Sequence, residues 1–299
     1  MTIVEPQSGR ERPSIWNERS GSGPAKVMLI HGIGSSGADF TRLVSCFDSG
    51  SSTVAPDLRG HGKSEASLPV TVEGFAADLL PLIDEEGPMV LAGFSFGSRV
   101  AMEIWRKRPE GVSALVLVDP PLVYGPLFEW ASRGGSGRHR LRHCLKKAAG
   151  ISGLGLSSLR RLGARWSREE ALARISAIYY SADVDEAVEL MRENPLTRDL
   201  DEADLLTNAR SLMAADRATL LATLELTGES EGQTRPPGAS IEPVVMFGDR
   251  SPMTDPDAAG AFAARIGGRA VSYSGGHVAH LEAPEEVAEE IERLLPGED

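Results

Sequence analysis

Short apolar runs bounded by turn residues alternate with segments of helical spacing along much of this chain. Pro88–Phe94 (PMVLAGF) and Ala114–Asp119 (ALVLVD) are continuous apolar runs, as expected of parallel strands buried on both faces. The intervening segment FGSRVAMEIWRKRP spaces its apolar residues as a helix does and ends in basic residues and Pro109. This strand–helix–strand order is typical of a parallel sheet covered by helices.

The same alternation continues on both sides of this unit. Further expected elements are the strands Ser52–Asp57, PVVMFGD and AVSYSG and the helices VEGFAADLLPLIDEE and PEEVAEEIERLL. Near the start, PSIWNER, SGSG and KVMLI predict two strands joined by a hairpin. The sequence therefore predicts an α/β fold, with a mostly parallel central sheet and helices on both faces.

Residues 121–237 interrupt this rhythm. They show no clear strand, and they contain helical patterns such as SREEALARISAIYYSA and DLLTNARSLMAADRATLLATLEL. We interpret 121–237 as a helical insertion, which leaves 1–120 and 238–299 as the core. Within the insertion, residues 131–168 carry ten Arg and Lys and no acidic residue. They form either a solvated helix face or a surface that attracts an anionic substrate or carrier. The Gly-rich loop Ser132–Gly137 indicates that this segment is mobile.

The bulk composition is that of an ordinary globular protein. The 299 residues are 41% hydrophobic and 25% charged, with a net charge of −12. This acidic balance argues against general nucleic-acid binding. The start of the chain has no apolar leader, and no run approaches the roughly 18 apolar residues of a membrane span, so we expect a cytoplasmic protein without a membrane partner. Cys46 and Cys144 lack metal-type spacing and are interpreted as thiols in a reducing compartment.

The first candidate for chemistry is GFSFG at Gly93–Gly97, which matches G-x-S-x-G. It follows the strand PMVLAG and opens the helix FGSRVAMEIW, which is the strand–turn–helix setting of a nucleophile elbow. The glycines permit the sharp turn, and the helix N-terminus stabilises negative charge on Ser95. We interpret Ser95 as a nucleophile, with a capping serine in an ordinary turn as the alternative.

A second motif, HGIG at His31–Gly34, follows the strand KVMLI. Its glycines permit close backbone approach, so its N–H groups can point at a developing oxyanion. We expect the donors to be the backbone N–H groups of Ile33 and Phe96. A plain glycine-rich turn is the alternative.

The expected general base is His277, which follows the strand AVSYSG at the same edge of the sheet. His280 is the alternative candidate for this role. Because it precedes Leu281-Glu282, we interpret it as a structural residue near the site. His61, in DLRGHGKS, follows a different strand and is interpreted as a loop residue.

In combination, HGIG, DLRGHGKS, GFSFG and GGHVAHLEAPEEV make the chain resemble the α/β-hydrolase family, from about Ile15 to Leu295. The resemblance implies that 121–237 is a helical cap over the active site. It also implies the chain order serine, acid, histidine. The serine at the elbow argues against dehalogenases and epoxide hydrolases, relatives that need aspartate at that position.

The acid is the point at which the sequence departs from this family. Similar members usually carry it three residues after a strand-ending glycine, here Gly248, but that position is Ser251. Some relatives place the acid at the end of the strand before the cap. That position is Asp119, from which a carboxylate can still orient the imidazole. Asp249, Asp255 or no acid at all stay open, and Asp119 also suits a turn-capping role.

Together these assignments predict a serine hydrolase of an ester, thioester or lactone that needs no metal and no cofactor. Its expected catalytic residues are Ser95, His277 and Asp119. Aromatic residues of the insertion indicate a small, mostly apolar substrate, unless they pack the insertion's own core; they are Trp130, Trp166, Tyr179 and Tyr180.

Ser251 keeps two other functions open. One is a lyase or cyclase that acts on a natural-product intermediate, and the other is a small-ligand binding protein with little turnover. Fold-level analogy does not separate them. The only partner we expect is a small-molecule substrate, and the sequence leaves open whether the protein is a monomer or a homodimer.

Overall fold

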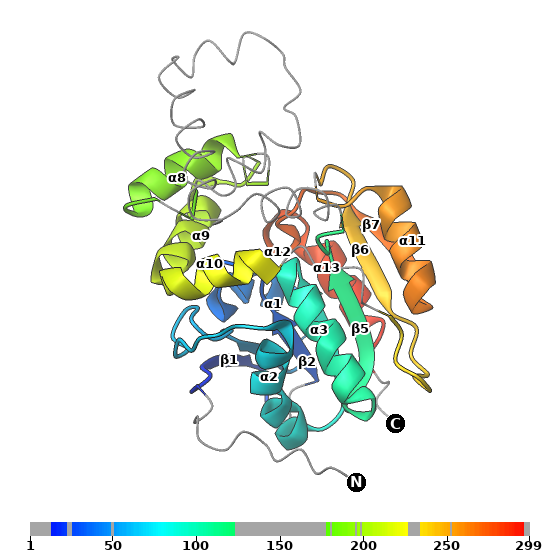
Figure 1. Ribbon diagram of the computed structural model, residues 1–299. Coiled ribbons are helices and arrows are strands. Elements are labelled where there is room, and N and C mark those ends of the chain that lie inside the picture. Colours follow the sequence, from blue (N-terminus) through cyan, green and yellow to red (C-terminus); the bar gives the residue numbers. More distant parts are fainter. Residues whose placement is uncertain are drawn as a thin grey trace, which may run out of the picture.

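The computed structural model describes residues 13–22, 26–48, 51–122, 178–179, 181–194, 196–197, 199–226, 234–251 and 253–295. Its centre is a seven-stranded sheet in the order β1-β3-β2-β4-β5-β6-β7 (Figure 1). The strands are β1 (Asn17–Ser20), β2 (Val27–Ile30), β3 (Thr53–Pro56), β4 (Met89–Phe94), β5 (Val112–Val118), β6 (Val244–Gly248) and β7 (Arg269–Tyr273). All neighbouring pairs except β1–β3 are parallel, which confirms the predicted mostly parallel sheet.

The predicted hairpin near the start of the chain is wrong. β1 pairs antiparallel with β3, from Asn17 opposite Pro56 to Ser20 opposite Thr53, and not with β2. The fully buried β2 instead lies between β3 and β4, with which it pairs in parallel. The polar strand NERS is half-buried to exposed, which suits an edge position.

Helices cover both faces of the sheet (Figure 1). Residues of α2 (Val72–Glu86), α3 (Phe96–Lys107) and α11 (Pro256–Ile266) share one buried apolar cluster. Residues of α1 (Thr41–Val44), α12 (Ala279–Glu282) and α13 (Pro284–Glu292) contribute to a second cluster. Short 3₁₀ turns occupy Gly37–Phe40 and Pro109–Gly111. The sheet is therefore the middle layer of three, as the strand–helix alternation predicts.

Helix α3 fits its sequence closely. The apolar side chains spaced along it are fully buried against the sheet; they are Val100, Ala101, Ile104 and Trp105. Its last turn carries Arg106 and Lys107, whose positive charges interact favourably with the negative C-terminal end of the helix dipole. The helix thus packs a wide apolar face against the sheet. This packing fixes the turn that joins the end of β4 to the start of α3.

In the described part of the chain between β5 and β6 lie three further helices: α8 (Val184–Glu193), α9 (Glu202–Ala214) and α10 (Arg217–Leu226). The long helical pattern over 204–226 is interrupted, because the Asp216 side chain accepts the Thr219 N–H at 2.8 Å and starts a new helix. These helices form a third apolar cluster that also includes Val278 and Leu281 of the core.

Several expectations for the insertion lie outside the described residues. They concern the basic segment 131–168, the loop Ser132–Gly137, Cys144 and the aromatic residues Trp130, Trp166 and Tyr180. The division of the chain at 120/121 and 237/238 stays a prediction. Among the helices in the described ranges, none has both the length and the apolar character needed to cross a membrane.

Candidate active site

The candidate residues meet at the carboxyl edge of the sheet. Ser95 directly follows β4, Asp119 directly follows β5, and His277 lies four residues beyond the end of β7. Phe94 and Val118 are partners in the β4–β5 register, so Ser95 and Asp119 leave neighbouring strands side by side. Crevices outside the carboxyl ends of parallel strands are the usual position of sites in such sheets.

Ser95 has the backbone of a strained turn, with φ 51° and ψ −119°. Such a conformation costs a non-glycine residue about 1–3 kcal/mol. A Cβ at position 93 would come within 2.4 Å of the Gly97 carbonyl oxygen, and one at position 97 within 2.1 Å of the Ile30 carbonyl oxygen. Both flanking residues of GFSFG must therefore be glycine for steric reasons.

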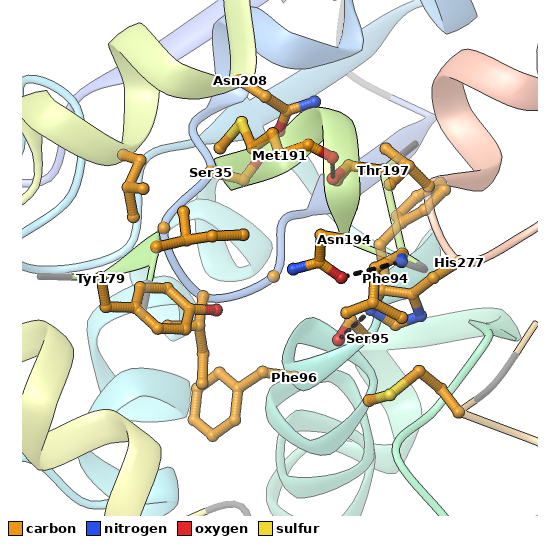
Figure 2. A pocket seen from close by; sticks show the side chains of 18 of the residues that line it. Ser35, Phe94, Ser95, Phe96, Tyr179, Met191, Asn194, Thr197, Asn208 and His277 are labelled. Carbon is orange, nitrogen blue, oxygen red and sulfur yellow. Dashed lines mark hydrogen bonds between the residues drawn. The ribbon is translucent and has the colours of Figure 1, made fainter. Parts of the chain in front are cut away.

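His277 lies between the other two candidate residues. Its Nδ1 is 2.5 Å from Oδ2 of Asp119. Its Nε2 is 3.1 Å from Oγ of Ser95, the contact drawn in Figure 2. Because an ionised carboxylate only accepts hydrogen bonds, it selects the tautomer protonated at Nδ1 and leaves Nε2 free to accept a proton. The Asp119 side chain is fully buried, and that of His277 is 12% exposed.

Ser251, at the position where similar sequences carry the acid, contacts this same carboxylate. Its Oγ donates a hydrogen bond of 2.5 Å to Oδ2 of Asp119 and accepts the Met253 N–H at 3.1 Å. Asp119 also has a positive φ of 43°, and its N–H donates to the Met246 carbonyl oxygen at 2.8 Å. The end of β6 thus supplies a hydroxyl that supports a carboxylate from β5.

The other candidate acids have different contacts. Oδ1 of Asp249 accepts the Gly275 N–H at 3.0 Å, and its side chain is 54% exposed. Asp255 begins α11 and accepts the Ala258 N–H at 2.7 Å. The carboxylate that the structure brings to His277 is that of Asp119.

The loop that carries His277 is held by a residue that the sequence analysis missed. The Glu282 carboxylate accepts the N–H groups on both sides of His277, from Gly276 at 2.7 Å and from Val278 at 3.0 Å. The Tyr273 hydroxyl donates to the Gly276 carbonyl oxygen at 2.6 Å. No sequence motif marks Glu282 for this role, because the contact depends on how the chain turns between β7 and α12.

His280, the competing histidine, lies apart from this chain of hydrogen bonds. Its ring packs against Phe40 and Phe94, with ring centroids 5.1 and 5.6 Å apart. Its Nε2 has no hydrogen-bond partner within the described ranges. Burial lowers the pKa of His280 to about 3, so its ring is neutral at physiological pH. His61 is also buried, and its Nδ1 lies 3.1 Å from the Arg59 carbonyl oxygen.

Buried imidazoles predict a loss of stability in mild acid. Burial lowers the pKa from 6.5 to about 3 for His31 and His280 and to about 4 for His61. The unfolded chain takes up these protons near pH 6.5, whereas the folded chain does not. We therefore expect the free energy of unfolding to fall from about pH 6.5 toward pH 4, by up to about 1.4 kcal/mol per pH unit for each histidine.

Urea denaturation of the wild type and of His280→Phe between pH 7 and pH 5 measures this effect. Phenylalanine keeps the ring contacts, so the variant should show a shallower loss of stability, with about one fewer titrating group. Burial raises the pKa of Asp39 and Asp57, and these carboxyls act in the opposite direction. The difference between the two proteins is therefore the decisive quantity, and identical slopes would contradict the prediction.

The loop after β2 approaches Ser95 closely. A Cβ at Gly32 would lie 3.2 Å from Cβ of Ser95. Ile33 and Phe96 line the same pocket as Ser95, and neither backbone N–H donates a hydrogen bond to another residue in the part of the chain that the structure describes. Their role as oxyanion donors stays a prediction.

A buried carboxylate, Asp39, ties this loop to helix α9. Its Oδ2 accepts the Ser35 hydroxyl at 2.6 Å and the Ser36 N–H at 3.1 Å, while its Oδ1 accepts the Ser211 hydroxyl of α9 at 2.7 Å. Burial raises the pKa of Asp39. The insertion is therefore bonded directly to the loop that carries one of the oxyanion donors.

A pocket opens over Ser95 between the sheet edge and the inserted helices (Figure 2). Its lining is mostly apolar. The residues contributed by the insertion are Pro121, Ile178, Tyr179, Met191, Asn194, Leu196, Thr197, Asn208, Leu212 and Leu224. Of the four aromatic residues expected to shape the substrate site, Tyr179 borders it, and burial raises its pKa to about 12.

Comparison with known proteins agrees with this architecture. The model of the alpha/beta hydrolase family matches residues 27–290, and the chain belongs to this family. Over 104 residues it is 43% identical to Lipase LipV of Mycobacterium tuberculosis, a segment that covers 34% of this chain and 40% of LipV. This chain thus covers well under two thirds of LipV's own length.

Solved structures share the fold at low sequence identity. A thermophilic esterase from Thermogutta terrifontis is 20% identical, with a TM-score of 0.64 and 95% of each chain covered. A hydrolase from Pseudomonas aeruginosa is 18% identical, with a TM-score of 0.68 and the same coverage. At this identity the likeness shows the fold alone. Together with the family match, these structures show that the chain has the alpha/beta-hydrolase fold.

Proposed function

We propose that the protein is a serine hydrolase of esters, thioesters or lactones, with Ser95, His277 and Asp119 as its catalytic residues. The observation that carries the proposal is the chain of hydrogen-bond distances from Ser95 Oγ through His277 to Asp119. The same constellation performs acyl transfer on several unrelated folds, so geometry identifies it better than sequence position does.

In this mechanism Ser95 Oγ attacks the substrate carbonyl carbon while His277 Nε2 takes its proton. The N–H groups of Ile33 and Phe96 stabilise the oxyanion of the tetrahedral intermediate. His277 then gives the proton to the leaving oxygen or sulfur, and an acyl-enzyme remains. In the second half of the reaction, water gives a proton to His277 and attacks the acyl carbon. The bond from that carbon to Ser95 Oγ then breaks, His277 returns the proton to Oγ, and the acid leaves. Throughout, Asp119 orients the ring and stabilises the imidazolium.

Two features of Asp119 support its role as the acid. It is fully buried, so its interaction with an imidazolium is little screened by water. It also accepts the Ser251 hydroxyl, a hydrogen bond that helps to hold the carboxylate in place beside His277. The main support for the lyase or cyclase alternative was Ser251 at the usual position of the acid, and a carboxylate beside His277 weakens that support. The mechanism needs a small-molecule substrate and no other partner or cofactor.

A fluorophosphonate probe tests the proposal, because it reacts irreversibly with an activated serine. We expect one modified peptide, the one that contains GFSFG, and no labelling of Ser95→Ala. Mass spectrometry after digestion identifies the site. Labelling at another serine, or none in the folded wild type, would overturn the covalent mechanism and favour the ligand-binding alternative.

A further inference from the structure

The pocket contains a polar group that the proposed mechanism does not use. Asn194 follows α8, is 1% exposed and lines the pocket together with Ser95 and His277. Its Oδ1 accepts the Leu196 N–H at 2.9 Å, which fixes the orientation of the amide, because only the oxygen can accept. Its Nδ2 has no hydrogen-bond partner in the described ranges. Figure 2 shows the oxygen in its dashed bond and the nitrogen on the opposite side, among the lining side chains.

An amide N–H that stays unpaired in the folded protein is costly. Leaving a buried donor unsatisfied costs about 1–3 kcal/mol, and most buried polar groups avoid this by finding a partner. Nδ2 of Asn208, on α9, is likewise buried without a partner among the described residues and borders the same pocket. Two such donors on the insertion's side of one pocket indicate that a ligand oxygen completes them.

The surroundings determine the charge of that ligand oxygen. No Lys or Arg is among the described residues that line the pocket. Of its two histidines, His280 is neutral at physiological pH, and His277 already faces the Asp119 carboxylate. A carboxylate or phosphate in this region would therefore find no counter-charge among these described residues, which is unfavourable for a buried charge. A ketone, hydroxyl or ether oxygen carries no such penalty.

We propose that Asn194 is a specificity-determining residue whose Nδ2 donates a hydrogen bond to a second, neutral oxygen of the substrate, apart from the reacting carbonyl. This inference rests on the proposed function and narrows its substrate class to oxygenated esters, thioesters or lactones rather than plain hydrocarbon ones. A site built to bond an oxygen discriminates against an analogue that lacks it, because the site's donor is then left unpaired.

The test is a panel of esters with one oxygen in different places. The parent compound is ethyl hexanoate. A neutral oxygen is added on the acyl side in ethyl 3-, 4- and 5-oxohexanoate and on the alcohol side in 2-methoxyethyl hexanoate. A negative charge is added in monoethyl adipate. Hydrolysis is followed by acid release. The measurement is kcat/KM for each ester divided by that for the parent. We expect the wild type to prefer at least one neutral oxygenated ester and to disfavour the adipate.

Two variants test the donor. Asn194→Leu removes the amide, and Asn194→Asp keeps an oxygen for the Leu196 N–H but replaces the donor. In both, the preference should fall by roughly threefold to tenfold, the range of about 0.5–1.5 kcal/mol for one neutral hydrogen bond. Thr197→Val is the matched control, because the Thr197 hydroxyl already donates to the Met191 carbonyl oxygen at 2.7 Å, so the preference should persist. The ratio does not depend on how much of a variant folds.

An unchanged ratio in both Asn194 variants would overturn the proposal and leave the amide with a structural role or a bound water. So would a wild type that shows no preference, or one that prefers monoethyl adipate. These results differ from failure of the proposed function. In that case the fluorophosphonate probe leaves Ser95 unlabelled and the parent ester is not hydrolysed at all.

Discussion

Ser95→Ala should reduce kcat/KM for ester hydrolysis by roughly 10⁴-fold or more, because the covalent route is lost and only binding and the oxyanion donors remain. Steady-state kinetics on an activated ester measures the loss. The folded protein should be unchanged, since alanine has the same Cβ at φ 51° and makes the same backbone contacts. A melting temperature close to that of the wild type is the control.

Ser95→Gly adds a second, independent signature. Glycine adopts positive φ without steric cost, so this variant should be more stable than Ser95→Ala by about 1 kcal/mol while being equally inactive. Stability that rises as activity disappears is expected where backbone strain serves the site. If glycine gave no gain in stability, the strain assigned to the turn would be wrong, whatever the kinetics showed.

The double variant Ser95→Ala/His277→Ala tests whether the two residues act as one unit. Residues of a triad are strongly non-additive, so the double variant should be about as slow as the slower single variant. A lyase or cyclase that abstracts a proton with His277 would behave differently. There Ser95→Ala would have a mild effect, and nearly all of the loss would come from His277→Ala.

Local chemistry explains which parts of the fold were predictable. The strand, the turn and the helix around GFSFG follow from a buried apolar run, two sterically required glycines and the spacing of α3. The partner of β1 was not predictable in this way, because it depends on which strand edge stays open after β2, β3 and β4 have assembled. Turn chemistry between PSIWNER and KVMLI favoured a hairpin, and tertiary pairing overrode it.

The candidate site shows the same division. Ser95 and His277 stand in local motifs at strand ends, so their sequence context singled them out. The sequence favoured Asp119 only through the family resemblance and left Asp249, Asp255 or no acid open. The choice depends on strand order and on the Ser251 hydroxyl reaching across from β6 to Asp119, which the sequence does not give. Asn194 and Glu282 carried no signal at all, since their roles depend on how a helical segment and a loop lie over the sheet edge.

Asp119→Asn should lower kcat by roughly 10²–10⁴, because the amide cannot stabilise the imidazolium and favours the wrong tautomer of His277. The fold should survive, since asparagine tolerates the positive φ of 43° at this position better than most residues. An unchanged melting temperature would exclude an effect that acts only through the turn after β5. A mild kinetic effect would mean that Asp119 is not the acid.

Ser251→Asp turns the same contact into a test of where the acid resides. In the wild-type background it sets a second carboxyl against Asp119, where the serine hydroxyl now donates at 2.5 Å. Two carboxylates this close share a proton, so His277 faces a weaker partner and kcat should fall. In the Asp119→Asn background the new carboxylate is alone, and it should restore activity by at least tenfold.

Each single change would then lower activity, while the double variant would be more active than Asp119→Asn alone. General destabilisation does not produce this pattern, because its effects add. The opposite result would be that Ser251→Asp raises the activity of the wild type and that Asp119→Asn has little effect. The wild-type site would then have no catalytic acid, and the role assigned to Asp119 would be wrong.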